Sequence, residues 1–300
     1  MASLRNPLAR LGYKLFTSRL GFFLFHRFKS THAAHSNCKV VSSGDIRVLP
    51  VPFATDNYAY LVWRKGHEQN GVAIDVGEAE AVFRTVQTRD VRVKNILTTH
   101  KHWDHSGGVA DFKSLSQMHF EDSVVARASA ADFTPGHDVT LACGETLEIG
   151  GMTVRVLSAS CHTRGHVAFY IEPQGGEGVL FTGDSLFVGG CGKFFEGDAV
   201  QMMATFKLMS ELPRSTLVFC GHEYTVSNYT FALSKVTNTE DLHRKIQARL
   251  LWAQQERRCG RPTVPSTLFE EKSTNVFFRT VYSTNSIAEL SNLRREKDST

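Results

Sequence analysis

The sequence predicts an α/β protein in which short strands alternate with helices. Short segments rich in β-branched and aromatic residues recur through the middle of the chain, and such segments are typical of strands. A helical pattern follows between Asp198 and Pro213, and the character of the sequence changes again after residue 223. With 300 residues, the chain is long enough for one or two domains with a substantial buried core.

Residues 1–44 are predicted to form a basic leader. They contain no Asp or Glu and seven Lys or Arg residues. Subtracting those seven from the total of 34 leaves 27 basic against 30 acidic residues in 45–300, a net charge of −3. The leader therefore accounts for the overall charge of +4, and nothing in the charge pattern indicates a nucleic-acid-binding protein.

The leader has the pattern of a mitochondrial transit segment. Its apolar residues fall on one helical face with the basic residues elsewhere: Leu4, Leu8, Leu11, Leu15 and Phe22. The apolar run 20–25 is far shorter than the ~20 residues that span a bilayer. We therefore expect location in the mitochondrial matrix. A peripheral membrane contact through residues 1–30, a cytoplasmic location and a merely disordered tail are the alternatives.

Seven strands are expected from local patterning: 46–51, 59–63, 96–99, 153–158, 167–171, 179–181 and 217–220. A helix is expected to begin near Asp198 and to end before Pro213, with Met202, Phe206 and Met209 in the core. A longer helix should open at Glu240-Asp241 and end near Gly260. The change of pattern divides the chain after the leader into two predicted domains, residues 45–222 and residues 223–300.

Metal-binding side chains are concentrated directly after the apolar run 96–99. Four of them lie within six residues, and three more follow at wide spacing: His100, His102, Asp104, His105, His162, Asp184 and His222. A site built from imidazole and carboxylate, without a Cys pair, is more often catalytic than structural. Four donors so close together cannot all reach one ion comfortably. The cluster therefore predicts two adjacent ions, and a solvated His-rich loop is the weaker reading.

The local spacing indicates how the donors are shared. In an extended chain, side chains two residues apart point the same way, so His100 and His102 should contact one ion together. Asp104 and His105 follow a turn and should face a second ion. Residues 106–108 (Ser-Gly-Gly) then provide an uncrowded path into a helix.

Several motifs make the chain similar to a known family. Residues 99–105 (THKHWDH) resemble the THxHxDH signature of the metallo-β-lactamase superfamily. Segments 56–61, 181–187, 190–197, 221–224, 263–267 and 294–298 resemble the glyoxalase II group, the hydroxyacylglutathione hydrolases. The match runs from about residue 46 to the end of the chain. It implies a metallo-β-lactamase-like αββα sandwich, the catalytic domain of residues 45–222, followed by a small helical C-terminal domain of residues 223–300 that binds the substrate.

The resemblance also implies the ligand sets and the reaction. One ion would be bound by His100, His102 and His162, and the other by Asp104, His105 and His222. Asp184 would bridge the ions, and Asp104 and Asp184 are the expected catalytic residues. Two divalent metal ions are expected, zinc first, with iron or manganese as alternatives. Coordination lowers the pKa of water from 15.7 to about 7, so a metal-bound hydroxide is expected to attack the thioester.

The implied substrate is S-D-lactoylglutathione, which yields D-lactate and glutathione in methylglyoxal detoxification, and a monomer is expected. The positions similar to the family's glutathione-binding residues are Lys193, Phe195, Tyr224, Arg294 and Lys297. Phe195 departs from the family, which commonly has Tyr there. Losing one hydroxyl contact costs roughly 0.5–1.5 kcal/mol, about tenfold in affinity.

Two other functions remain open on sequence alone. A persulfide dioxygenase-like protein would use one iron, which the complete second donor set disfavours. A membrane-associated interaction protein with residual hydrolase activity is suggested by the leader and by Phe195. Outside the ligand set, His166 is expected to be a structural partner. Asp75 is expected to support the metal-binding loop by hydrogen bonding.

Overall fold

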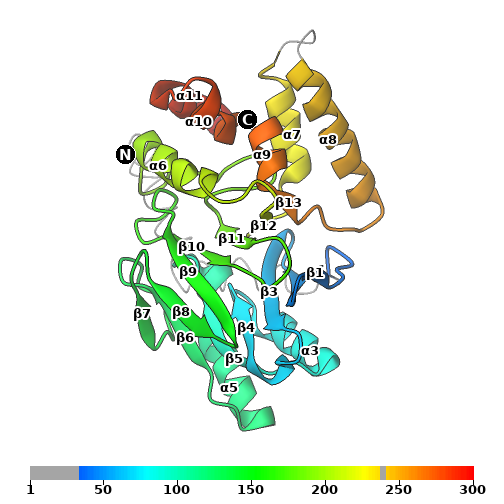
Figure 1. Cartoon of the computed structure of the whole chain (residues 1–300), viewed down its shortest axis with the longest axis vertical. Helices are drawn as coiled ribbons and strands as arrows, with labels where there is room; N and C mark the ends of the chain where they lie inside the picture. Colours follow the sequence, from blue (N-terminus) through cyan, green and yellow to red (C-terminus); the bar gives the residue numbers. More distant parts are fainter. Residues whose placement is uncertain (1–33, 237–240) are drawn as a thin grey trace.

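Two β-sheets form the centre of the computed structural model, which describes residues 34–236 and 241–300 (Figure 1). The first sheet has seven strands in sequence order. They are β1 (Val41–Ser43), β2 (Ile46–Phe53), β3 (Asn57–Arg64), β4 (Gly71–Ile74), β5 (Val93–Leu97), β6 (Val125–Ser129) and β7 (Val139–Leu141). A short 3₁₀ helix, η1 (Glu68–Asn70), precedes β4. Strands β1 to β4 pair antiparallel, and β4 to β7 pair parallel.

The second sheet has six strands in the order β13-β12-β11-β10-β9-β8. They are β8 (Thr146–Ile149), β9 (Met152–Ser158), β10 (Val167–Ile171), β11 (Val179–Gly183), β12 (Leu217–Cys220) and β13 (Ser266–Thr267). Only β11 and β12 pair parallel. The chain crosses between them through α6 (Ala199–Ser210), because parallel neighbours require a crossover connection.

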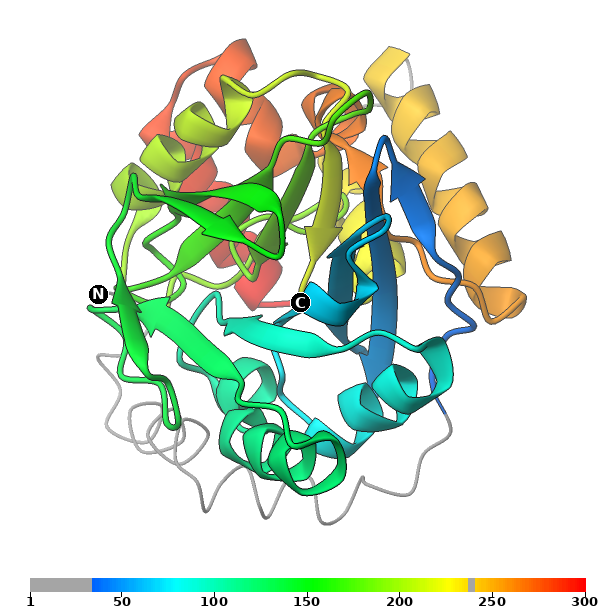
Figure 2. The ribbon, with the colours of Figure 1, turned by 60° about the horizontal axis from the view of Figure 1, so that its bottom comes forward.

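Alternation along β3 shows how the layers are built. Tyr58, Tyr60 and Val62 belong to the core shared with the second sheet, whereas the intervening residues belong to the core on the other face. This is the two-residue period of a strand covered on both sides. The outer face of the first sheet packs against α3 (Ala79–Arg89) and α5 (Val109–Phe120), seen in the foreground of Figure 2.

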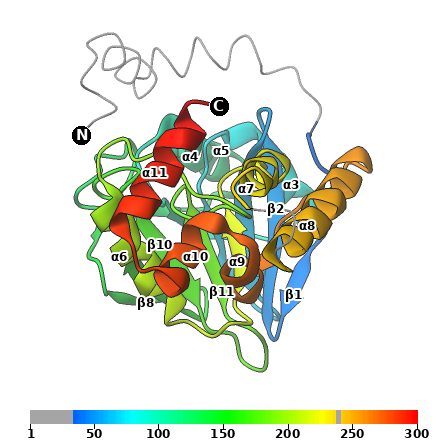
Figure 3. The ribbon, with the colours of Figure 1, turned by 90° about the horizontal axis from the view of Figure 1, so that it is seen from above.

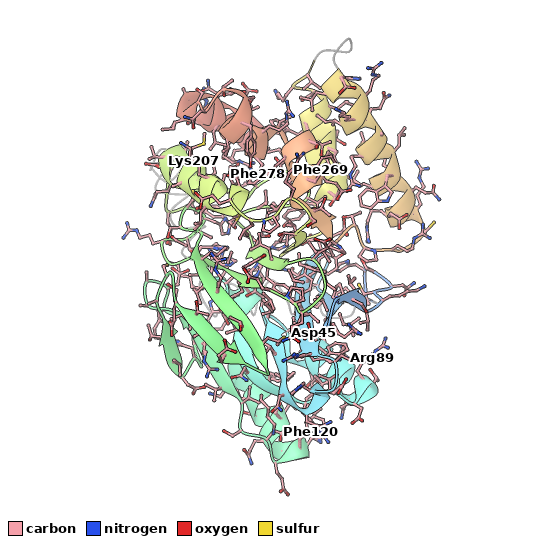
Figure 4. The ribbon with its side chains drawn as sticks, viewed as in Figure 1. Asp45, Arg89, Phe120, Lys207, Phe269 and Phe278 are labelled. Carbon is pink, nitrogen blue, oxygen red and sulfur yellow. The ribbon has the colours of Figure 1, made fainter. Side chains whose placement is uncertain are left out.

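The second sheet is covered by α6 together with helices from the end of the chain (Figure 3). The C-terminal helices are α7 (Thr225–Leu233), α8 (Asp241–Arg258), α9 (Leu268–Thr274), α10 (Val276–Ser283) and α11 (Ile287–Asp298). The ring of Phe206 on α6 meets the ring of Phe278 on α10 edge to face, with centroids 5.2 Å apart. Figure 4 labels Phe278. The four layers confirm the predicted αββα sandwich with its helical C-terminal part.

Most predicted elements are confirmed, with two informative differences. Helix α6 is capped by Asp198, whose side chain accepts from the amides of Val200 and Gln201, and its three predicted core residues are buried. The strand expected over 96–99 ends at Leu97, because the amide of Thr99 donates to the Asp75 carboxylate instead. Strands β1, β4, β6, β7, β8 and β13 were not predicted, since they are short and follow no clear alternation.

The leader prediction falls largely on residues 1–33, which lie outside the described residues. The described part of the predicted leader, from residue 34, joins the fold: β1 pairs with β2, and Ser36 is buried. Residues 41–43 of the predicted leader therefore belong to the first sheet. Within the described ranges, no helix combines the length and the apolarity needed to cross a membrane.

The turn Phe187–Gly190, which follows β11, is held by a buried acid from α9. Glu271 is fully buried, and its Oε2 accepts hydrogen bonds from the Gly189 amide and from Asn275 Nδ2, each at 2.9 Å. Asn275 also donates to the carbonyl of Gly190. Burial raises the pKa of Glu271 from 4.5 to about 7, despite these hydrogen bonds.

The raised pKa predicts a pH-dependent stability. The folded chain keeps the Glu271 proton up to about pH 7, whereas the unfolded chain releases it near pH 4.5. Below pH 4.5 the free energy of unfolding is therefore higher by about 3 kcal/mol than when the acid is ionised. This stabilisation is lost as the pH rises through 7. Glu271→Gln, which mimics the protonated acid, should lack this loss. Denaturant unfolding of the metal-free protein from pH 5 to 8 checks it. An equally steep loss in Glu271→Gln would contradict the prediction, and Glu80→Gln, exposed on α3, is the control.

Candidate metal centre

The predicted donors lie on loops that leave strand ends at one edge of the two sheets. His100 and His102 follow β5, and His102 precedes the single-turn helix α4 (Trp103–Ser106), which carries Asp104 and His105. The donors from the second sheet follow β9, β11 and β12: His162, Asp184 and His222. Gly183 (φ 47°) allows the sharp exit from β11, and a Cβ on it would meet Thr99 Oγ1 at 2.4 Å. The close approach of the two sheets therefore requires glycine there.

The structure brings all seven donors together. Within each of three groups, the potential ligand atoms lie within 4.8 Å of one another. The groups are His100/His102/His162, His100/His105/Asp184 and Asp104/His105/His222. The first and third of these match the two sets implied by the family resemblance. All the donors are buried except Asp104, which is partly buried.

Asp184 lies between the two sets. Its Oδ2 is 3.4 Å from Nε2 of both His162 and His222, and its Oδ1 is 3.4 Å from Nε2 of His105. Oδ1 is buried and has no hydrogen-bond partner among the described residues. A buried carboxylate oxygen normally has a partner, so this orphaned oxygen fits a position next to a cation.

Outer partners direct the imidazole lone pairs inward. Nδ1 of His105 donates to Asp75 and Nδ1 of His222 donates to Asp56, at 2.9 and 2.8 Å. Nδ1 of His162 donates to the carbonyl of Lys193 at 2.9 Å. In each ring the proton on Nδ1 leaves Nε2 as the lone-pair donor, which is the arrangement found around protein-bound metals.

The two sets differ in their protonation. Burial, followed by the charge on His162, lowers the pKa of His102 to about 3. Burial also lowers the pKa of His100 and of His162. At His105 burial acts in the same direction, but the carboxylates of Asp184 and Asp104 outweigh it and raise the pKa to about 9. The imidazoles of the first set are therefore neutral. A metal ion that binds at the second set must displace the protons that its imidazoles hold between the carboxylates.

These observations fit a dinuclear metal site made of His and Asp donors. Both sets offer three ligand atoms, the oxygen between them has no hydrogen-bond partner among the described residues, and His105, His162 and His222 each donate from Nδ1 to an outer oxygen. Such nitrogen and oxygen donors suit divalent transition metals.

Two residues next to the second set carry no role in the sequence interpretation. Asp56 orients His222, and Asn57 Nδ2 donates to Asp104 Oδ2 at 3.0 Å. The sequence indicates segment 56–61 only as a family motif, because contacts between residues that are 47 or 166 positions apart leave no local pattern. The expectations for Asp75 and His166 are confirmed: Asp75 supports Thr99 and His105, and His166 accepts from the Asp184 amide.

A cavity of about 690 Å³ opens from the donors toward the C-terminal helices. It is within the range of small-molecule sites. His102, Asp104, His162, Asp184 and His222 form one end. The remaining wall comes from the loop after β11 and from α7 and α11, and it includes Phe187, Lys193, Phe195, Tyr224, Phe231, Arg294 and Lys297.

Comparison with known proteins identifies the family. The family model for the metallo-beta-lactamase superfamily matches residues 53–222, and that for the hydroxyacylglutathione hydrolase C-terminus matches residues 223–300. The chain is 39% identical to the cytoplasmic hydroxyacylglutathione hydrolase of Arabidopsis thaliana over 237 residues, 78% of this chain and 88% of the relative. This chain belongs to the hydroxyacylglutathione hydrolase family of the metallo-β-lactamase superfamily.

Other relatives agree with this assignment. A hydroxyacylglutathione hydrolase from Synechococcus is 38% identical over 84% of this chain and 99% of the relative. Among solved structures, a metallo-beta-lactamase from Staphylococcus aureus (19% identity, TM-score 0.56) covers 79% of this chain and 62% of its own length. ETHE1 from Myxococcus xanthus (18% identity, TM-score 0.55) covers 87% and 89%. These two structures share the fold.

In this member of the hydroxyacylglutathione hydrolase family, the predicted substrate-binding residues all line the cavity but differ in availability. Lys193 is exposed and Lys297 is partly buried. The Tyr224 ring stacks on His222, with centroids 4.7 Å apart. Phe195 contacts the rings of His102 and His162.

Arg294 is already engaged. It is 5% exposed, its Nη1 donates to the Cys191 carbonyl at 2.7 Å, and its Nη2 pairs with Asp298 at 2.9 Å. These contacts tie α11 to the loop after β11. Lys193 and Lys297 are the more exposed cations of the predicted set. The Lys297 ammonium donates to the carbonyl and the hydroxyl oxygen of Ser227, at 3.0 and 2.9 Å.

Proposed function

We propose that this chain hydrolyses the thioester of 2-hydroxyacylglutathiones, with S-D-lactoylglutathione as substrate and D-lactate and glutathione as products. The observation that carries this proposal is the two converging donor sets at one end of a cavity that has lysines along its wall. The relatives at 38–39% identity bear the hydroxyacylglutathione hydrolase name, which supports it.

The proposed ligands are His100, His102 and His162 for one ion, and Asp104, His105 and His222 for the other, with Asp184 shared. Bound divalent ions supply Lewis-acid chemistry: they make water a nucleophile at neutral pH and polarise a carbonyl oxygen. The residues of the chain supply the geometry for that chemistry. Asp75 and Asp56 fix the rings of His105 and His222, and Asn57 fixes the Asp104 carboxylate.

The cavity wall is proposed to hold the glutathione part. Glutathione carries two carboxylates, and Lys193 and Lys297 lie on the wall of the cavity. Tyr224 presents its hydroxyl from a ring stacked on His222. Phe195 places an apolar edge against His102 and His162, so it shields the reacting end from water rather than donating a hydrogen bond.

Lys297→Ala should raise KM about tenfold and leave kcat nearly unchanged, because the proposed role of Lys297 is to bind the substrate's tail, away from the reacting bond. Steady-state kinetics on S-D-lactoylglutathione measure both parameters. Lys235→Ala is a matched control: both ammonium groups sit about 5 Å from the Phe231 ring, but Lys235 pairs with Glu296 and does not line the cavity. A large fall in kcat with KM unchanged would contradict the assigned role.

The function is tested by turnover of S-D-lactoylglutathione by the purified full chain. The same sample is offered glutathione persulfide with oxygen consumption recorded. Thioester cleavage without oxygen consumption is the expected result. Oxygen consumption without thioester cleavage would overturn the proposal in favour of a dioxygenase.

We propose further that zinc occupies both positions, that the enzyme is a monomer acting in methylglyoxal detoxification, and that the basic leader directs it to the mitochondrial matrix. The donor types support zinc, although iron and manganese use the same ligands. The leader's composition supports the location. Elemental analysis of the protein isolated from the organism that produces it tests the metal. Protease protection in fractionated mitochondria tests the location.

A further inference from the structure

The segment His35–Asn37 lies directly behind the second donor set. His35 Nε2 donates to the Asn57 carbonyl at 2.9 Å, and the His35 ring meets the Tyr58 ring edge to face, with centroids 5.0 Å apart. Burial lowers the pKa of His35, so the ring is neutral at pH 7. Nδ1 can then accept from the Ser36 hydroxyl, 2.9 Å away.

Helix α8 fixes this segment from the other side. Arg257 Nη1 donates to Ser36 Oγ and Nη2 donates to the His35 carbonyl, both at 2.7 Å. The Asn37 amide donates to the Gly260 carbonyl just after α8, also at 2.7 Å. Ser36 is 4% exposed. The segment is therefore held between α8 and the start of β3, with Ser36 buried, His35 partly buried and Asn37 exposed.

The residues that it contacts are the ones that hold the second donor set. Asn57 receives the His35 hydrogen bond on its carbonyl and donates from its side chain to Asp104. Asp56, one residue earlier, holds the His222 ring. Tyr58, one residue later, donates to Glu223 at 2.6 Å, and Glu223 follows His222 directly.

Two residues of the first set are supported from other parts of the chain. His100 is supported by Thr99, and His162 by the Lys193 carbonyl. Through Asn57 and the neighbouring Asp56, the contacts of His35–Asn37 lead to Asp104 and His222. The two donor sets therefore depend on different parts of the chain.

We propose that His35, Ser36 and Asn37 form an N-terminal clamp that positions Asp56–Tyr58 and thereby sets the affinity of the second metal position, leaving the first unaffected. The proposal rests on the metal ligands assigned under the proposed function. It also implies that any processing of the leader must leave His35 in place for the second ion to be retained.

The test measures ion affinity separately at each position, in the full chain. In a His102→Ala background the first set is incomplete, so the remaining ion reports on the second set. In a His222→Ala background the remaining ion reports on the first. Co²⁺ is titrated into both backgrounds, and its d–d absorption gives the affinity and the ligand geometry.

His35→Ala and Arg257→Gln should each weaken Co²⁺ binding about tenfold or more in the His102→Ala background. Neither should change binding in the His222→Ala background. His35→Gln keeps a donor at the Nε2 position and should restore the affinity. Arg258→Gln, on the exposed neighbouring residue of α8, is the matched control and should change nothing.

Unchanged affinity in the His102→Ala background would overturn the clamp, and so would equal weakening in both backgrounds. Loss of the metal-free fold in both His35→Ala and Arg257→Gln, followed by circular dichroism, would also overturn it, because the segment would then support the whole fold. Failure of the unsubstituted chain to bind two ions would instead count against the proposed metal site itself.

Discussion

Asp184→Asn should lower kcat/KM for thioester cleavage by about 10³-fold, equivalent to several kcal/mol of transition-state stabilisation. Asp184 is the residue that both donor sets share: its oxygens lie 3.4 Å from Nε2 of His105, His162 and His222. The substitution keeps the shape and removes the charge, so the affinity for both ions should fall together. Elemental analysis and steady-state kinetics on one preparation measure the two effects.

Asp111→Asn is the control, since Asp111 is an exposed carboxylate on α5. It should keep the wild-type ion content and rate. If Asp184→Asn retained both ions and the wild-type rate, Asp184 would not connect the two sets, and the proposed ligand assignment would be wrong.

Gly221→Ala should lower the rate on the order of 10²-fold without removing a ligand. A Cβ at Gly221 would lie 2.4 Å from Asp184 Oδ1 and 2.6 Å from His105 Cε1. Both distances are shorter than van der Waals contact, so two donors from different strands must move apart. A displacement of about 1 Å is enough to cost on the order of 10²-fold in rate. Kinetics at saturating metal, together with the Co²⁺ spectrum, should show a distorted site in a folded chain.

Gly144→Ala provides the comparison for Gly221→Ala. An added Cβ at Gly144 meets nothing within 4 Å, although its φ of +86° makes any side chain unfavourable. We expect a modest loss of stability, about 1–2 kcal/mol, with both ions and the rate unchanged. A Gly221→Ala enzyme that behaved like Gly144→Ala would show that the donors tolerate displacement.

The sequence predicts the donor cluster well, because four of its seven metal-binding residues lie close together in the chain. His100, His102, Asp104 and His105 lie within six residues after a predicted strand, and the two-residue period divides them between two groups that the structure also forms. The predicted helix with Met202, Phe206 and Met209 on its inner face is equally local, and its capping box is visible at Asp198.

What the sequence does not indicate is the support that comes from distant parts of the chain. Asp56 and His222 are 166 residues apart, and His35 and Arg257 are 222 apart, so no spacing rule relates them. The charge pattern predicts a leader over residues 1–44, and it does not indicate that β1 pairs with β2 or that Ser36 is buried.

Arg294 illustrates a different limit. Its spacing from Lys297 predicts one helix face, and both do lie on α11 and line the cavity. Spacing cannot show that the Arg294 guanidinium is already bonded to the Cys191 carbonyl and to Asp298. Tertiary packing decides which of the cations is exposed to a ligand.

The most direct measurement is the rate of S-D-lactoylglutathione hydrolysis as ions are returned to the chelator-treated full chain. Two converging donor sets predict that the rate rises with the number of bound ions and becomes constant at about two ions per chain. Full activity with one ion bound, or in the chelated protein, would contradict the account.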